Sequence, residues 1–113
     1  LDLGHARQID PTMVESIDML RQFGSRLRQI HLSEVTTNCR HERLSLAAIQ
    51  SFRRIAARVS EEIPVIIESV LSAQPTLAQM SAELVQAAKA LPLHSASLAS
   101  EPRSVRPSIG AEI

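Results

Sequence analysis

The sequence contains very few aromatic residues. Its 113 residues include two Phe and no Trp or Tyr, so few flat side chains are available to stack on nucleobases. The 12 basic and 12 acidic residues give a formal net charge of zero, which supplies no overall attraction to a phosphate backbone. We therefore do not expect nucleic acid to be the main partner.

Cysteines and long apolar runs are also scarce. The single cysteine, Cys39, excludes an internal disulfide. Nothing resembles a signal peptide, and no uninterrupted apolar run reaches the roughly 18 residues of a membrane span. These absences favour a cytoplasmic protein that does not enter a membrane.

The chain alternates short apolar stretches with helical patterns. Residues 1–5 read as the end of a strand, and residues 27–32 and 63–68 read as two further strands. This alternation favours an α/β fold with parallel strands. A helical bundle is the rival fold, but it must explain why Pro64 precedes a β-branched run too short for an ordinary helix.

Helix starts and ends are marked by capping residues. Asp10 stands before Pro11, Ser45 precedes the second pattern, and Pro75-Thr76 opens a third that runs to Leu91. Gly24 can end the first helix in a left-handed conformation. The expected apolar stripes are Met13, Ile17 and Leu20, then Ile49, Phe52, Ala56 and Val59, and finally Leu77, Met80, Leu84 and Ala88.

Polar segments complete the organisation. Residues 33–43 read as a long loop after a strand, the kind of segment that often carries chemistry. We expect one domain over residues 1–91 and a disordered Ser- and Pro-rich tail over residues 92–113. Since the chain begins at Leu1, inside an apparent strand end, we interpret it as a fragment or a processed chain. Three arginines, Arg53, Arg54 and Arg58, read as a solvated face rather than a phosphate site.

Asp2, His31 and Glu68 each close one of the three expected strands. Because the carboxyl ends of parallel strands share one rim, these side chains can meet around one divalent cation. Carboxylate and imidazole ligands together suit Mn²⁺, Mg²⁺, Zn²⁺, Fe²⁺ or Co²⁺. Taken singly, Asp2 can instead cap a turn, His31 can be a hydrogen-bonded interior residue, and Glu68 can pair with an arginine, Arg28 or Arg40.

Further histidines lie near the expected rim. His5 follows Asp2 by three positions and is either a second ligand or a substrate contact. Cys39 and His41 lie two apart, a spacing that allows zinc binding or a nucleophile and base. A solvated loop position is the simpler interpretation for Cys39, whereas His41 lies near enough to the rim to remain a site candidate. His94 falls in the expected tail and is set aside.

These motifs resemble the xylose isomerase-like (β/α)8 (TIM) barrels, a superfamily of sugar phosphate isomerases and epimerases that also includes the family 2 AP endonucleases. The resemblance covers residues 1–91 and rests on short segments: Asp2-Leu3-Gly4-His5, Ile30-His31-Leu32-Ser33-Glu34, His41-Glu42-Arg43-Leu44 and Ile66-Ile67-Glu68. It implies the three C-terminal βα units of a barrel that is incomplete on its own, because a closed barrel needs roughly 250 residues.

The resemblance also implies roles. Asp2, His31 and Glu68 would ligate a divalent metal together with a fourth ligand, a Glu from an earlier strand that is absent here, with Mn²⁺ or Mg²⁺ favoured over Zn²⁺ or Co²⁺. Glu68 would also act as one of two carboxylates that move a proton at carbon through an enediolate, while His5 and His41 would contact a small polyhydroxy substrate. The implied partners are the missing N-terminal part of the barrel and a second copy of the chain.

Two other functions stay open at this stage. One is cleavage at abasic DNA, as in the endonuclease branch of the superfamily. Cys39 stands where that branch has a metal-binding Asp, and the glycines that commonly follow the loop His are replaced by Ser45 and Ala47. The other is a catalytically inactive barrel fragment that serves protein association through exposed apolar strand faces.

Overall fold

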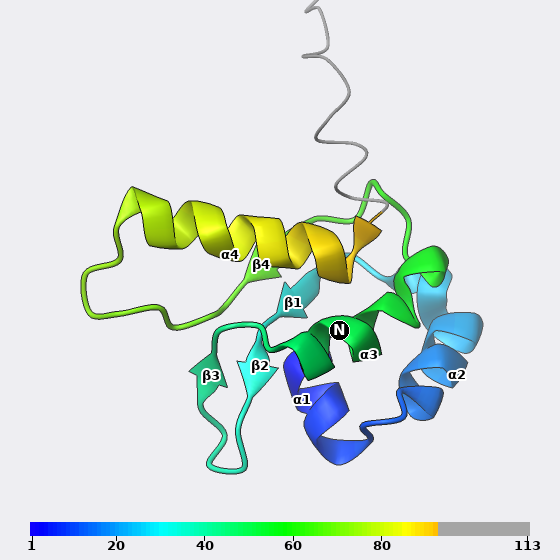
Figure 1. The fold of residues 1–113 in the computed structure, drawn as a ribbon. Helices are drawn as coiled ribbons and strands as arrows, with labels where there is room; N and C mark the ends of the chain where they lie inside the picture. Colours follow the sequence, from blue (N-terminus) through cyan, green and yellow to red (C-terminus); the bar gives the residue numbers. More distant parts are fainter. Residues whose placement is uncertain (93–113) are drawn as a thin grey trace, which may run out of the picture.

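Helices and strands are mixed along the chain, as the sequence predicts (Figure 1). The computed structural model describes residues 1–92, so the predicted disorder of the tail lies outside the described residues apart from Pro92. The elements in chain order are α1 (Leu3–Ile9), α2 (Val14–Phe23), η1 (Gly24–Arg26), β1 (Ile30–Leu32), β2 (Glu34–Val35), β3 (His41–Glu42), α3 (Leu46–Arg53), η2 (Ala56–Arg58), β4 (Val65–Ile67) and α4 (Leu77–Ala90).

The two predicted strands form β1 and β4, and they pair in parallel with His31 opposite Ile66. A third chain segment joins β1 on its other edge, where Asp2 forms an isolated parallel bridge with His31. Each pairing is held by backbone hydrogen bonds, since His31 N donates to Leu1 O and Glu68 N donates to Leu32 O, both at 2.9 Å. Three chain segments therefore run side by side in one direction.

The core lies on one face of this small sheet. Ile30 and Leu32 of β1 are fully buried against the helices, while His31 between them points to the opposite face. The second predicted stripe is confirmed, because Ile49, Phe52, Ala56 and Val59 are all buried. The neighbouring arginines are exposed, as expected of a solvated face: Arg53, Arg54 and Arg58.

The first prediction to fail concerns residues 3–5, which begin α1 rather than end a strand. The strand-like pairing stops at Asp2, and the Asp2 carboxylate accepts a hydrogen bond from His5 N at 3.0 Å. This N-cap satisfies one of the amides left unpaired at a helix start, so the chain turns into a helix immediately.

Helix α2 begins at Val14, later than Pro11. Met13 precedes it in the left-handed region with φ 63°. Asp10 still stabilises this start, because its carboxylate accepts hydrogen bonds from Thr12 and from Glu15 N. The Thr12 hydroxyl is the main cause of the lowered pKa of Asp10. Gly24 does not take the predicted left-handed conformation: its φ is −56°, and the chain continues into η1.

The predicted loop 33–43 contains a small antiparallel hairpin of β2 and β3, with Val35 opposite His41. Its turn is closed by a hydrogen bond from Cys39 N to Thr36 O at 2.9 Å, and Cys39 takes a positive φ of 57°. Strands of two residues leave almost no periodicity in a sequence, so the pattern gave no sign of them. His41 is consequently fixed on a strand.

The third helix is predicted correctly, but its stripe is not. Thr76 caps α4 with a capping box that includes Gln79, and the helix runs to Ala90. The buried positions are Glu83, Ala87 and Ala90, whereas the predicted Leu77, Met80 and Leu84 are exposed. Small alanines allow close contact with α3, and this packing decides the orientation of the helix. No helix within residues 1–92 has the length and apolarity needed to span a bilayer.

We predict that Gly4→Ala destabilises the protein by about 1–3 kcal/mol, the usual cost of overpacking. An added Cβ at Gly4 would lie 2.5 Å from Val35 Cγ2 and 2.7 Å from the backbone oxygen of Ser33. Gly24→Ala is the matched control, because a Cβ there meets nothing within 4 Å. Urea unfolding followed by circular dichroism measures both, and equal free energies of unfolding would contradict the described packing.

We also predict that Leu84→Gln changes the free energy of unfolding by less than about 0.5 kcal/mol, because Leu84 is 56% exposed. Ala87→Gln is expected to cost about 1–3 kcal/mol, since it forces a longer side chain into the buried contact with α3. Thermal unfolding of the two variants compares them directly. A larger loss of stability in Leu84→Gln than in Ala87→Gln would contradict this packing and support the apolar stripe predicted from the sequence.

Candidate metal centre

The parallel pairing brings Asp2, His31 and Glu68 together at one end of the sheet. Asp2 and His31 are bridge partners, and His31 lies opposite Ile66. Glu68 follows Ile66 by two positions, so the alternation of a strand places it on the same face. One ligand atom from each of the three residues lies within 4.8 Å of the other two. The predicted convergence of these three side chains is therefore present.

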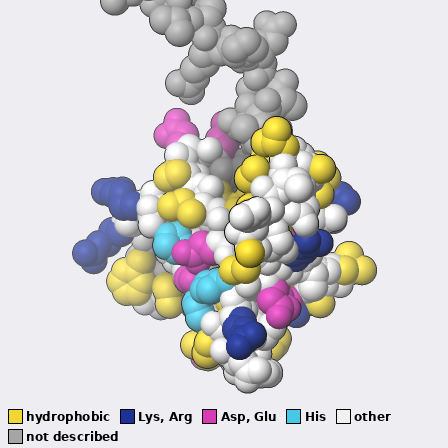
Figure 2. Space-filling view, turned by 90° about the vertical axis from the view of Figure 1, so that its left-hand side faces the viewer, with side chains coloured by type: hydrophobic (Ala, Val, Ile, Leu, Met, Phe, Trp, Pro, Cys, Tyr) yellow, Lys and Arg dark blue, Asp and Glu magenta, His cyan; other side chains and the backbone are white. Residues whose placement is uncertain are grey.

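The three side chains are partly open to solvent. The His31 and Glu68 side chains are each 30% exposed, and the Asp2 side chain is 29% exposed. Figure 2 shows histidine and acidic side chains gathered together on one face of the molecule. A small molecule can therefore reach the cluster from that face.

The single-residue alternatives are partly realised as well. Asp2 caps α1, but the cap uses Oδ1 and leaves Oδ2 facing His5 Nε2 at 3.9 Å. The described salt bridges of Glu68 are with two histidines and include neither Arg28 nor Arg40. Asp2 therefore caps a helix with one carboxylate oxygen, and Glu68 pairs with histidines of the cluster rather than with an arginine.

His31 is held from both ring nitrogens. Its Nδ1 lies 3.0 Å from Glu68 Oε1, and its Nε2 lies 2.7 Å from Gln29 Nε2. Because the Gln29 amide nitrogen can only donate, His31 Nε2 accepts this hydrogen bond and Nδ1 carries the proton that faces Glu68. Gln29 was not singled out from the sequence, although its position two residues before His31 puts it on the same face of the strand.

His5 and His41 complete the cluster. His41 Nδ1 lies 3.7 Å from Glu68 Oε2 and 2.8 Å from Ser33 Oγ. The rings of His5 and His41 meet edge to face, with centroids 5.1 Å apart. Both predicted substrate-contacting histidines therefore border the three candidate ligands. Ser33, which is fully buried, is a second residue that the sequence reasoning missed.

Cys39 takes no part in this cluster. It is exposed in the hairpin turn, and its Sγ lies 3.9 Å from Gln8 Nε2. Within residues 1–92, Asp2, His31 and Glu68 form the only group of three or more His, Cys, Asp or Glu side chains that could hold a metal ion. The structure therefore favours a solvated position for Cys39 over a zinc site with His41.

The donor set fits a divalent cation. Two carboxylates and one imidazole suit borderline and hard cations such as Mn²⁺, Mg²⁺ and Zn²⁺. Because the three side chains are partly exposed, a cation held by them would also be accessible to water or to oxygens of a small molecule.

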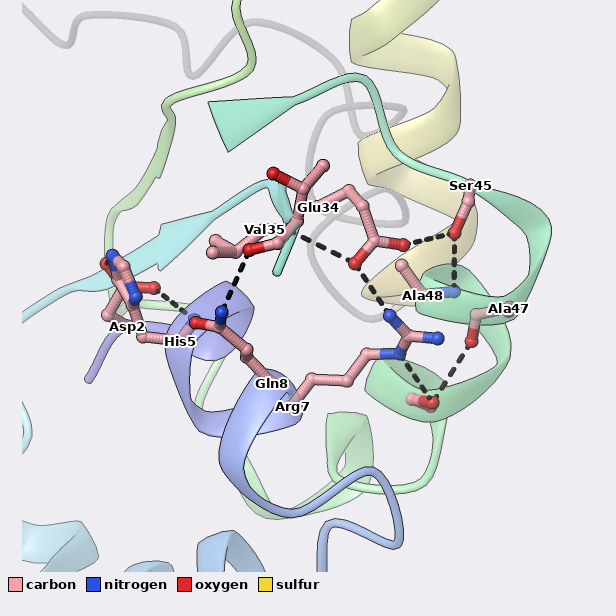
Figure 3. A network of polar contacts seen from close by, with 11 residues as sticks. Asp2, His5, Arg7, Gln8, Glu34, Val35, Ser45, Ala47 and Ala48 are labelled. Carbon is pink, nitrogen blue, oxygen red and sulfur yellow. Dashed lines mark hydrogen bonds and ion pairs between the residues drawn. The ribbon is translucent and has the colours of Figure 1, made fainter. Parts of the chain in front are cut away.

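A second polar network holds α1 in place beside this centre (Figure 3). Arg7 of α1 donates to Glu34 Oε1 of β2 at 2.6 Å and to Ser51 Oγ of α3 at 3.2 Å. Glu34 also accepts a hydrogen bond from Ser45, the residue that caps α3. Because Asp2 is the N-cap of α1 and His5 lies within it, this network restrains the two cluster residues at the start of the helix.

Function has to be argued from these residues and their geometry. No protein-family model matches the chain, and no curated protein or solved structure is significantly similar to it.

Proposed function

We propose that this chain carries the divalent-metal centre of an isomerase or epimerase that acts on a small polyhydroxy substrate. The observation that supports the proposal is the convergence of Asp2, His31 and Glu68 from three parallel segments. These residues were selected from sequence spacing alone, and the same three form the candidate ligand group among residues 1–92.

We further propose that the three βα units belong to a (β/α)8 barrel whose other strands come from the N-terminal part of the parent protein. Two observations support this assignment. The face of the sheet that carries His31 and Ile66 is turned away from the helices, as the interior of a barrel would be. Ile66 is also 44% exposed, which is unusual for a parallel strand and leaves an apolar side chain to be covered.

Each residue has a proposed role. Asp2, His31 and Glu68 would hold the cation, which when bound polarises neighbouring hydroxyl and carbonyl oxygens. Glu68 would accept a proton from a substrate carbon beside a carbonyl group. A second carboxylate, from outside this chain, would deliver a proton to the opposite face of that carbon, so that the carbon is epimerised with no net gain or loss of protons. His5 and His41, on the rim of the cluster, would donate to or accept from substrate hydroxyls.

A second candidate function is phosphodiester cleavage with several cations. The position of His5 and His41 beside the three ligands favours it, because they offer further nitrogen donors. The two functions differ in the number of cations required. Binding of one Mn²⁺ per chain favours the isomerase, binding of two or more favours the phosphodiesterase, and no stoichiometric binding favours the association fragment.

We predict that the full chain binds Mn²⁺ at one site and that Glu68→Gln weakens this affinity by about 100-fold or more, because it removes one anionic ligand. Isothermal titration calorimetry, after EDTA treatment and desalting, gives the stoichiometry and the affinity. Circular dichroism checks that each variant keeps its helix content.

Glu62→Gln is the matched control, because it removes the same charge from an exposed position outside the cluster. Its affinity for Mn²⁺ should equal that of the unmodified chain within about twofold, since an exposed distant charge is largely screened. Equal loss of affinity in both variants would reject the assigned ligand role of Glu68.

A further inference from the structure

We propose that Glu83 is a positioning residue for the candidate metal centre and holds together the two chain segments that carry His41 and Glu68. The proposal rests on the proposed function, because it assigns a support to that same site. Glu83 lies on α4, outside the cluster and outside every motif of the sequence.

Glu83 is a carboxylate in a buried position. Its side chain belongs to the face of α4 that contacts α3, and the residue is only 5% exposed. Burial of a carboxylate is unfavourable unless hydrogen bonds compensate it. The neighbouring contact positions on this face are Ala87 and Ala90, so packing alone does not call for a charged residue here.

Two hydrogen bonds reach the same oxygen of Glu83. Leu44 N donates to Oε1 at 2.8 Å, and Ser69 Oγ donates to Oε1 at 2.6 Å. Leu44 follows β3, the strand that contains His41, and Ser69 directly follows Glu68. One buried oxygen therefore joins the segments that supply two members of the cluster.

A second contact joins the same two segments. The Arg43 guanidinium donates to Leu71 O at 3.3 Å. Both contacts involve residues that closely follow His41 and Glu68 in the sequence, and His41 Nδ1 lies 3.7 Å from Glu68 Oε2. Because Arg43 is exposed and Glu83 is buried, the hydrogen bonds of Glu83 are less screened by water than the hydrogen bond of Arg43.

The first arm of the test needs no metal. In ¹H–¹⁵N spectra of the metal-free chain, Glu83→Ala should expose the Leu44 amide to hydrogen exchange and shift the Glu68 amide and His41 ring resonances. Glu83→Gln keeps an acceptor oxygen and should restore most of the unmodified pattern. Leu84→Ala, on the exposed face of the same helix, is the control and should leave these signals unchanged.

The second arm measures Mn²⁺ affinity. Glu83→Ala should lower the affinity about tenfold, as expected for loss of an outer support, and Glu83→Gln should recover it to within about threefold. Leu20→Ala destabilises the core away from the cluster and controls for a general loss of stability, so its affinity should stay unchanged in the folded range.

The outcomes are separable. If Glu83→Ala does not fold, Ser69→Ala removes one of the two hydrogen bonds and should give smaller shifts of the same resonances. Unchanged Glu68 and His41 signals in a folded Glu83→Ala or Ser69→Ala chain would overturn the positioning role. Failure of the unmodified chain to bind Mn²⁺ would instead reject the proposed function and leave the spectroscopic arm to decide the role of Glu83.

Discussion

Every feature of the cluster depends on the backbone register of three parallel segments. Hydrogen bonds from His31 N to Leu1 O and from Glu68 N to Leu32 O set which residues lie side by side. A slip of one residue would turn His31 into the core and bring Ile30 or Leu32 to the open face. The fully buried positions of Ile30 and Leu32 make such a slip costly, so hydrophobic burial on one face of β1 fixes the polar arrangement on the other.

Polar contacts then fix the elements that surround the sheet. The Arg7 and Glu34 side chains are 20% and 14% exposed, so their ion pair is only partly screened by water. Breaking such a pair leaves an uncompensated charge, which is more costly than the net gain from forming it. The pair links α1, β2 and α3, while Glu83 links α4 to the segments after β3 and β4. In both cases a largely buried carboxylate holds separate elements together.

Sequence patterns predicted the parts of this structure that local chemistry decides. Ser45 and Thr76 cap their helices as expected, and the β-branched run after Pro64 forms the strand that ends before Glu68. Tertiary contacts decided the rest. The apolar residues of α4 fit two faces of a helix, and only packing against α3 selects the face with Ala87 and Ala90. The start of α1 depends on Asp2 as its N-cap. An Asp at this position fits either the end of a strand or the cap of a helix, so the sequence alone does not distinguish the two.

The candidate site was predictable because parallel strands bring their ends together, whatever the exact lengths of the strands. The residues around the candidate site were not predictable. Ser33 and Glu83 form contacts between separate segments, and Gln29 contacts His31 two positions along the same segment. Such contacts have no periodic trace in a sequence. The three residues at the strand ends could therefore be predicted from the sequence. The residues that contact their segments could be identified only from the structure.

The parallel pairing also has a kinetic consequence. Two parallel strands are joined by a long crossover connection, which must close before any hydrogen bond forms between them. Closing this loop costs chain entropy, so contacts between parallel strands form slowly. Asp2, His31 and Glu68 lie on three segments separated by two such connections. The cluster therefore forms only after both connections have closed, so a chain that has paired only two of the three segments lacks it.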